Sequence, residues 1–309
     1  MRIIPKTALS LICLAGLLPA CSSSEPESSA RPNIVVTYSV LGSVVADLVG
    51  DAAAVTILIP DGQDPHDYQP SARDIESINN ADIVVSNGLD FEEGLEDVLA
   101  SAIDNGVSVY MVGENITVRE PDEDLAEEGH AEEEGHAEED GHAHGAGDPH
   151  LWLSPLSFTE ALPSLTTAIN EATGLSIDET TALDQLTQLD DEITEVIGGI
   201  SSCVLVSGHD EMGYFADRYG CTVIGAIIPS FSTTSEATAK QIADLKVLAT
   251  SNNVKAVFTG LGTPTEVSEQ LASELGIAAV SLSTHYLNGA ANYREFMLNL
   301  ANQIAEALR

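Results

Sequence analysis

Short apolar runs alternate with helical patterns through the first third of the chain. Each run holds four to six mostly apolar or β-branched residues. Runs of this length are typical of parallel strands that are covered by helices on both faces. The pattern predicts strands at residues 34–38, 55–59, 82–86 and 107–112, and helices through 44–49 and from about residues 71 and 91.

The same alternation returns after residue 200, with strands predicted at 203–207, 221–226, 254–259 and 277–282. Between the halves, a helical pattern ends with Leu183, Leu186, Leu189, Ile193 and Ile197, and residues 292–308 predict a closing helix. We therefore expect an α/β protein with two doubly wound parallel-sheet lobes joined by a long helix. The predicted boundaries are 33–155 for the N-terminal lobe, 156–200 for the connecting helical segment and 201–309 for the C-terminal lobe.

The first 32 residues do not share this pattern. Residues 1–20 combine a basic start with an apolar run that is too short for a stable membrane span, which predicts a signal peptide. The signal ends in Leu18-Pro-Ala-Cys21, which resembles a lipobox, and Cys21 would carry the lipid. An uncleaved anchor, or a plain secretory signal with a chance cysteine, stays open. Residues 21–32 are polar and Ser-rich, which is typical of a tether.

The amino-acid composition indicates which classes of ligand the protein can bind. The 309 residues include 49 acidic and 11 basic side chains, for a formal net charge of −38. A surface that lacks clustered positive charge is unsuited to nucleic acids or anionic membranes, so cations are the favoured ligands. Export also predicts an oxidising compartment, where Cys203 and Cys221, each at the start of a predicted strand, form a possible disulfide. Two reduced, buried cysteines remain the alternative.

One acidic tract, residues 120–147, interrupts the α/β pattern. Gly-His-Ala recurs in it every six residues, and the tract holds His130, His136, His142 and His144. Repelling carboxylates and small residues cannot build a core, so we expect a disordered loop. A regular histidine repeat favours loose, low-affinity capture of metal over a merely solvated insertion.

The other four histidines, His66, His150, His209 and His285, each follow a predicted strand, two in each lobe. Ligands of open α/β sheets bind beyond the carboxyl ends of the strands, so a cleft between the lobes would gather all four. A single histidine at the end of a strand more often has a structural role than a metal-binding one. Four of them at strand ends in both lobes favour a metal site, because neutral imidazole is the commonest metal ligand.

Three segments around these histidines carry a family resemblance. They are residues 64–74 (DPHDYQPSARD), 148–155 (DPHLWLSP) and 208–220 (GHDEMGYFADRYG). Together with residues 86–89 (SNGL) and the His-rich insertion, they resemble the zinc/manganese ABC-transporter substrate-binding proteins, a cluster that includes streptococcal-type metal-binding lipoproteins. The resemblance covers essentially the whole mature chain.

This resemblance implies a high-affinity receptor, not an enzyme, that binds a divalent metal outside the cell and delivers it to a membrane permease and its ATPase. By position, His66, His150 and His209 match family ligands. Many members place an aspartate in a Leu-Asp-Pro segment as the fourth ligand, where this chain has Leu282, Ser283 and Thr284. The fourth position would then belong to water, to His285 or, as a poor ligand, to Ser283. A nitrogen-rich set favours Zn²⁺ over the alternative, Mn²⁺.

Neighbouring residues suggest how the ligands are supported. Asp64, Asp148 and Asp210 lie close enough in sequence to accept the second ring N–H of a ligating histidine, although Asp64 and Asp148 could instead shape turns before proline. Two alternatives to the receptor remain. A zinc-dependent hydrolase also uses three histidines and an open position, but the chain has no His-Glu-x-x-His helix. A surface metal buffer or adhesin would lack a permease.

Overall fold

A computed structural model describes residues 31–120 and 147–309. Residues Arg31–Arg309 form one compact unit. The predicted signal peptide, Cys21 and the tether up to residue 30 lie outside the described residues. So do residues 121–146, which hold the four histidines of the acidic tract, His130, His136, His142 and His144.

The first lobe is built on a four-stranded parallel sheet in the order β2-β1-β3-β4. Its strands are β1 (Asn33–Val36), β2 (Ala54–Ile57), β3 (Ile83–Ser86) and β4 (Val109–Met111). All of β3 and most of β1 are buried, as expected for central strands covered on both faces, whereas β2 is an exposed edge. All four strands fall within or next to the predicted runs.

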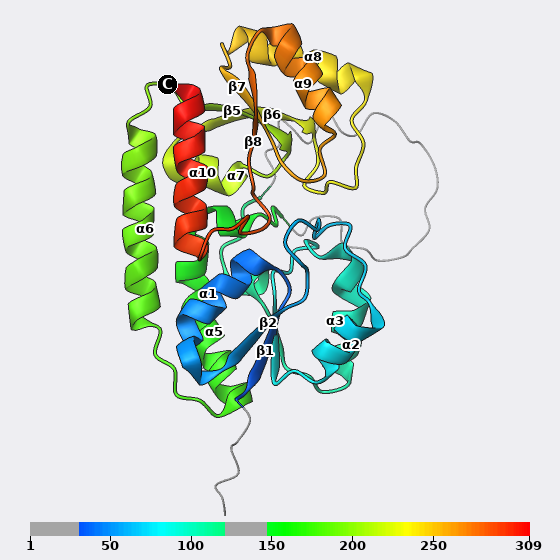
Figure 1. The fold of residues 1–309 in the computed structure, drawn as a ribbon, viewed down its shortest axis with the longest axis vertical. Helices are drawn as coiled ribbons and strands as arrows, with labels where there is room; N and C mark the ends of the chain where they lie inside the picture. Colours follow the sequence, from blue (N-terminus) through cyan, green and yellow to red (C-terminus); the bar gives the residue numbers. More distant parts are fainter. Residues whose placement is uncertain (1–30, 121–146) are drawn as a thin grey trace, which may run out of the picture. The chain divides into compact units, whose positions relative to one another are not determined.

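Helices α1 (Ser39–Val49), α2 (Ala72–Asn79) and α3 (Glu96–Asp104) connect these strands (Figure 1). Helix α2 begins with a capping box, because Ser71 and Asp74 each accept from the other's backbone N–H. Three short 3-10 segments lie at Gly50–Ala52, Glu93–Leu95 and Val112–Asn115. Because the four strands are parallel, the loops at their carboxyl ends emerge at one edge of the sheet.

The predicted helical connection consists of two helices of equal length. Helix α5 (Pro155–Thr173) follows the 3-10 segment Leu151–Leu153, and α6 (Thr180–Gly198) leads into the second lobe. Helix α5 ends where Gly174 takes a left-handed conformation with φ of 71°, which glycine adopts without a Cβ penalty. The apolar positions of α6, including Leu186, Leu189 and Ile193, are buried, and α6 packs against α5 and α10 (Tyr293–Leu308).

The second lobe contains two parallel pairs, β5 (Val204–His209) with β6 (Thr222–Ile228), and β7 (Ala256–Thr259) with β8 (Ala278–Ser281). Strands β5 and β7 also contact each other. Helices α7 (Gly213–Tyr219), α8 (Ala239–Ser251) and α9 (Thr265–Leu275) join the strands. The chain thus has the predicted α/β class with two lobes of parallel strands.

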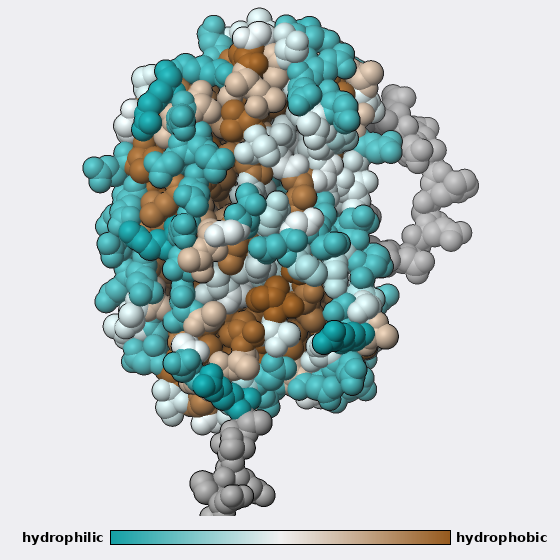
Figure 2. Space-filling model, viewed as in Figure 1, coloured by the Kyte–Doolittle hydropathy of each residue, from teal (hydrophilic) through white to brown (hydrophobic). Residues whose placement is uncertain are grey.

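One apolar cluster extends through both lobes. It includes Val35 and Val84 of the first sheet, Phe158 of α5, Phe215 of α7 and Phe258 of β7. A second, smaller cluster lies under α8 and α9. Hydrophilic side chains cover much of the visible face, with apolar groups between them (Figure 2). None of the helices in residues 31–120 and 147–309 is long and apolar enough to cross a bilayer.

The two cysteines of the second lobe, Cys203 and Cys221, form a disulfide with a Cα–Cα distance of 4.7 Å. They flank the start of the β5–β6 pair, where the backbone N–H of Thr222 also donates to the carbonyl of Cys203. The bond closes a segment with a sequence separation of 18. It therefore restrains the unfolded chain around α7 and the strand that ends at His209.

Replacing Cys203→Ser and Cys221→Ser together is expected to lower the free energy of unfolding by about 3 kcal/mol, because a loop of this length gains that much chain entropy when it is released. Urea denaturation of the oxidised wild type and the double variant measures the difference. A reductant should weaken the wild type and leave the variant unchanged. Equal midpoints for the two oxidised proteins would contradict the prediction.

Candidate metal centre

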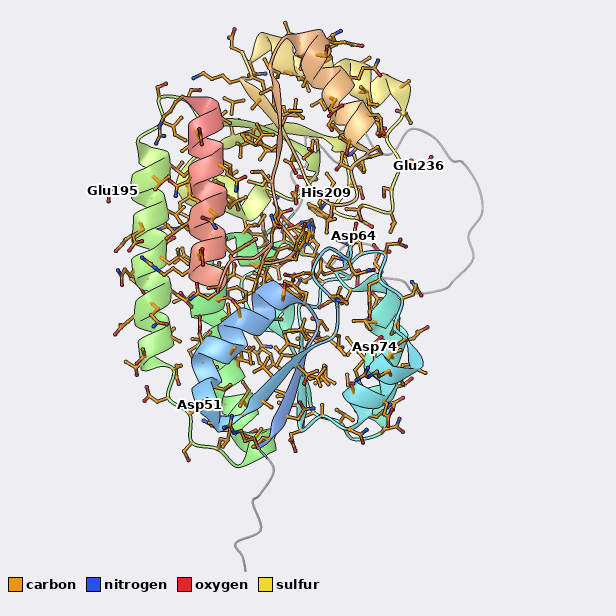
Figure 3. All side chains as sticks on the ribbon, in the orientation of Figure 1. Asp51, Asp64, Asp74, Glu195, His209 and Glu236 are labelled. Atoms are coloured by element: carbon orange, nitrogen blue, oxygen red, sulfur yellow. A yellow bond between two sulfur atoms is a disulfide. The ribbon has the colours of Figure 1, made fainter. Side chains whose placement is uncertain are left out.

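Four loops at the carboxyl ends of strands carry the four described histidines. His66 lies between β2 and α2, and His150 precedes the 3-10 segment Leu151–Leu153. His209 is the last residue of β5, and His285 follows β8. In Figure 3, His209 lies where the loops of the two lobes meet. The structure thus brings together the three predicted ligands and one of the two candidates for the fourth position.

The four rings form a compact, dry cluster. One ligand atom from each lies within 4.8 Å of those from the others, and the side chains are at most 2% exposed. All six pairs of ring centroids are 5.0–5.8 Å apart. The Nε2 atoms of His150 and His209 are 3.1 Å apart, so these two nitrogens, one from each lobe, face each other. The other candidate, Ser283, donates its hydroxyl to the carbonyl of Tyr286.

A carboxylate lies near the Nδ1 atom of every ring. Asp148 Oδ1 is 2.9 Å from Nδ1 of His150 and also accepts from the backbone N–H of that residue. Glu211 lies 3.8 Å from Nδ1 of both His209 and His285. Glu93 lies 3.8 Å from Nδ1 of His66. Nδ1 directed at a carboxylate leaves Nε2 as the available donor atom, which is the usual arrangement of metal-binding histidines.

The two aspartates that precede proline have different roles. Asp148 contacts the ring of His150, as expected for a supporting carboxylate. Asp64 accepts instead from the backbone N–H of His66, at 3.1 Å, and from the hydroxyl of Thr233 in the second lobe, at 2.8 Å. It therefore shapes the turn around His66 and links the lobes at the edge of the cluster.

Arg119 joins the base of the acidic tract to the site. Its carbonyl accepts from the backbone N–H of Asp148 at 2.9 Å, and its guanidinium lies 3.6 Å from the Asp148 carboxylate. The same side chain donates to Asp217 of α7 at 2.8 Å, and its backbone N–H donates to the hydroxyl of Tyr214. Tyr214 thus helps to hold the two lobes together.

The aromatic rings of Trp152 and Phe91 pack against the histidine cluster. Trp152 is fully buried 5.4 Å from His150 and 5.7 Å from His285, between ring centroids. Its indole N–H donates to the carbonyl of Thr284 at 2.6 Å, which fixes the two histidine segments relative to each other. Phe91, also fully buried, has its ring centroid 4.9 Å from that of His66. These rings exclude water from the nitrogens.

The loop that follows β3 is fixed by a second buried carboxylate. Glu92 accepts from the backbone N–H groups of Asn87 and Gly88, and burial raises its pKa to about 7. Leu89 and Asp90 have positive φ values of 59° and 57°, so this support holds a strained backbone in place. Neither Phe91 nor the carboxylates of Glu93 and Glu211 was predicted as part of the site from the sequence.

Burial keeps the rings of His66, His209 and His285 uncharged. It lowers the pKa of His66 from its ordinary value of 6.5 to about 3, with a further contribution from His150. The pKa values of His209 and His285 also lie well below the ordinary value, first because of burial and then because of the neighbouring histidines. Neutral imidazole is the form that binds metal, so burial prepares these nitrogens for a cation.

The chemistry of the cluster fits a divalent ion. Among the described residues, no hydrogen-bond partner reaches either ring nitrogen of His66 or the Nε2 atom of His285. Buried polar atoms without partners are costly, and a metal ion at the centre of the cluster would bind one nitrogen of each ring. Four nitrogen donors suit tetrahedral zinc better than manganese, which prefers oxygen ligands.

Two lobes of parallel strands with a polar cluster at the strand ends between them define a two-lobed α/β solute-binding protein. The chain belongs to the family described as zinc-uptake complex component A, periplasmic, whose model matches residues 34–307. The predicted family is thereby confirmed.

Individual relatives agree with this assignment. The chain is 28% identical over 278 residues to the high-affinity zinc uptake system protein ZnuA of Bacillus subtilis, covering 87% of this chain and 84% of that protein. It is 26% identical over 270 residues to the zinc-binding protein AdcA of Streptococcus pyogenes, covering 82% of this chain but only 50% of the relative. The chain thus spans about half the length of AdcA.

Among solved structures, the periplasmic zinc-binding protein TroA of Treponema pallidum has a TM-score of 0.74 at 22% identity, covering 90% of this chain and 99% of TroA. This likeness confirms the two-lobed fold.

The depressed pKa of His66 predicts a pH-dependent stability of the metal-free protein. Below pH 6.5 the His66 side chain is protonated in the unfolded chain, whereas in the folded chain it stays neutral down to about pH 3. The stability that depends on neutral His66 is therefore lost as the pH falls from about 6.5 to about 3. Urea denaturation of the wild type and His66→Leu at several pH values isolates the effect. The wild type should lose up to about 1.4 kcal/mol per pH unit relative to the variant. Parallel pH profiles would refute the assignment.

Proposed function

We propose that this protein binds a zinc ion outside the cytoplasm and delivers it to the membrane permease of an ABC transporter. The main support is the convergence of four buried histidines, two from each lobe, on one point. A nitrogen-only donor set favours zinc, and the carboxylates near the Nδ1 atoms strengthen the rings as ligands. The family description, a component of a zinc-uptake complex, supports the transport role.

In this proposal His66, His150, His209 and His285 are the ligands. His285 takes the fourth position in preference to Ser283, because its Nε2 atom is buried without a partner among the described residues while the hydroxyl of Ser283 is bonded to Tyr286. Since each lobe supplies two ligands, binding of the ion couples the positions of the two lobes. A permease that recognises the lobes together would then respond to the loaded form.

The same geometry favours a receptor over the alternatives. A zinc hydrolase needs one position open to water and substrate, whereas these four rings enclose their common centre at no more than 2% exposure. A manganese receptor would be expected to offer oxygen ligands. An adhesin or surface buffer would not need a ligand set divided between two lobes.

The anchoring and collecting functions rest on the sequence. We propose that residues 1–20 direct export, that Cys21 carries a lipid that holds the protein at the outer face of the membrane, and that the permease and its ATPase are the partners. The tract 120–147, with His130, His136, His142 and His144, is proposed to collect zinc loosely and to raise its concentration near the site.

Substituting any one of His66, His150, His209 or His285 by Ala is expected to weaken zinc binding by at least about 100-fold, because a tetrahedral site loses one of four donors and a buried centre cannot easily replace it with water. Competition titration against a chromophoric zinc chelator measures the affinity. Circular dichroism of each variant checks that it folds.

The matched control deletes residues 121–146, which removes four other histidines and leaves the site intact. This variant should keep one tight zinc site and lose only additional weak binding in calorimetry. Loss of the tight site on deletion, or tight binding by the alanine variants, would contradict the proposed division between site and collecting loop.

Cys21→Ser tests the anchor separately. The wild type should partition with membranes through detergent phase separation, because a lipidated N-terminus buries acyl chains in the bilayer, whereas the variant should be recovered in the aqueous extracytoplasmic fraction. Its zinc affinity should equal that of the wild type. Equal partitioning of the two proteins, with no acyl mass on the wild-type N-terminus in mass spectrometry, would exclude lipidation at this residue.

A further inference from the structure

Glu211 is a buried carboxylate whose position among the histidines calls for an explanation. Its side chain is 2% exposed and lies two residues after His209, at the end of β5. A buried carboxylate is costly unless neighbouring groups compensate for its charge. A hydrophobic side chain of similar size would pack at this place at lower cost.

The local backbone directs this side chain into the cluster. The N–H of Glu211 donates to the carbonyl of His209 at 2.9 Å, and the N–H of Asp210 donates to Ser230 at 3.0 Å. The hydroxyl of Ser207 donates to the same carbonyl of His209. The chain therefore makes a tight turn directly after β5, and this turn brings the side chain of Glu211 back toward the ring of His209.

The two carboxylate oxygens of Glu211 face two different rings. Oε1 lies 3.8 Å from Nδ1 of His209, and Oε2 lies 3.8 Å from Nδ1 of His285. The rings are stacked, with their centroids 5.1 Å apart and an interplanar angle of 24°, so a single carboxylate at their edge can reach both. One side chain can thus serve a ligand from the end of β5 and a ligand from the loop after β8.

Among the described residues, the Nδ1 atom of His209 and the Oε2 atom of Glu211 have no hydrogen-bond partner. Both atoms are buried, so neither can turn to water. Nδ1 of His209 faces Oε1 of Glu211 and Oε2 faces Nδ1 of His285, each at 3.8 Å, so a shift of about 1 Å would bring each pair into hydrogen-bond distance. The hydroxyl of Thr284 lies 3.0 Å from Nδ1 of His285 and also hydrogen-bonds Glu211, so it competes with the carboxylate for this ring.

Charge also favours a carboxylate here. Four neutral imidazoles around a divalent ion leave two positive charges in a dry interior, and negative charge close to the rings lowers that cost. Asp148 lies against His150 but contacts neither His209 nor His285. Glu211 is the carboxylate that lies against these two rings.

We propose that Glu211 is a positioning residue that acts on two zinc ligands at once. Its carboxylate accepts Nδ1–H from both His209 and His285, turns their Nε2 atoms toward the ion and supplies negative charge that the nitrogen ligands lack. This role rests on the proposed function and deepens it: the affinity of the site for zinc, not only its shape, depends on Glu211.

Glu211→Gln tests the proposal, because it keeps the size of the side chain and removes its charge. Zinc affinity of this variant should fall by about 10- to 100-fold, as is usual when the hydrogen-bond partner of a metal-binding histidine is lost. Glu211→Asp keeps the charge at a greater distance from the rings and should lose less affinity than the Gln variant. The absorption bands of bound Co²⁺ should shift in both, because the rings that ligate it are reoriented.

Asp190→Asn is the matched control. Asp190 is also a buried carboxylate, and its hydrogen bonds go to Arg218 and Tyr219 of α7. Its substitution should alter the unfolding midpoint but leave the zinc affinity and the Co²⁺ spectrum unchanged.

The outcomes separate the two proposals. If the wild type binds no zinc, the proposed function itself fails. If the wild type binds zinc through its histidines but Glu211→Gln binds it equally tightly and with the same Co²⁺ spectrum, only the role of Glu211 is overturned. A larger loss in Glu211→Asp than in Glu211→Gln would show that shape, not charge, is what the site requires.

Discussion

Holding uncharged imidazoles together in a dry interior is the constraint on which the rest of this structure depends. Each ring has two nitrogens, and a buried nitrogen without a partner is costly. A carboxylate lies near the Nδ1 atom of each ring, at hydrogen-bond distance in His150 and at 3.8 Å in His66, His209 and His285, and the remaining nitrogens are left to a cation. The aromatic walls formed by Phe91 and Trp152 make the requirement strict, because they keep out the water that would otherwise satisfy these atoms.

The parallel arrangement of the strands allows the four histidines to lie together. In each lobe the strands run in the same direction, so the loops at their carboxyl ends share one edge, and the two edges face each other. Hydrogen bonds between the lobes then set the distance: Trp152 donates to Thr284, Thr233 donates to Asp64, and Arg119 contacts both Asp148 and Asp217. The apolar core cluster continues through α5, α6 and α10 and stabilises the arrangement in which these contacts form.

The sequence allowed prediction of the eight strands and of the histidines at their ends, because continuous apolar runs and strand-end ligands are local patterns. The supporting carboxylates were harder to predict. Asp148 lies two residues before its histidine in a recognisable turn, but Glu211 contacts His285, 74 residues away, only because the fold of the second lobe brings the loops after β5 and β8 together. Glu93 and Phe91 likewise reach His66 from another loop of the first lobe. The break between α5 and α6 had one local signal, Gly174, which the long apolar periodicity obscured.

The hydrogen bond between Arg119 and Asp148 has a consequence for how this protein can diverge. It brings the backbone on either side of the acidic tract to a single point, so an insertion there starts and finishes at the same place on the fold. A change in the length of the tract therefore leaves Arg119 and Asp148 in place, and with them the contact of Asp148 with the ring of His150.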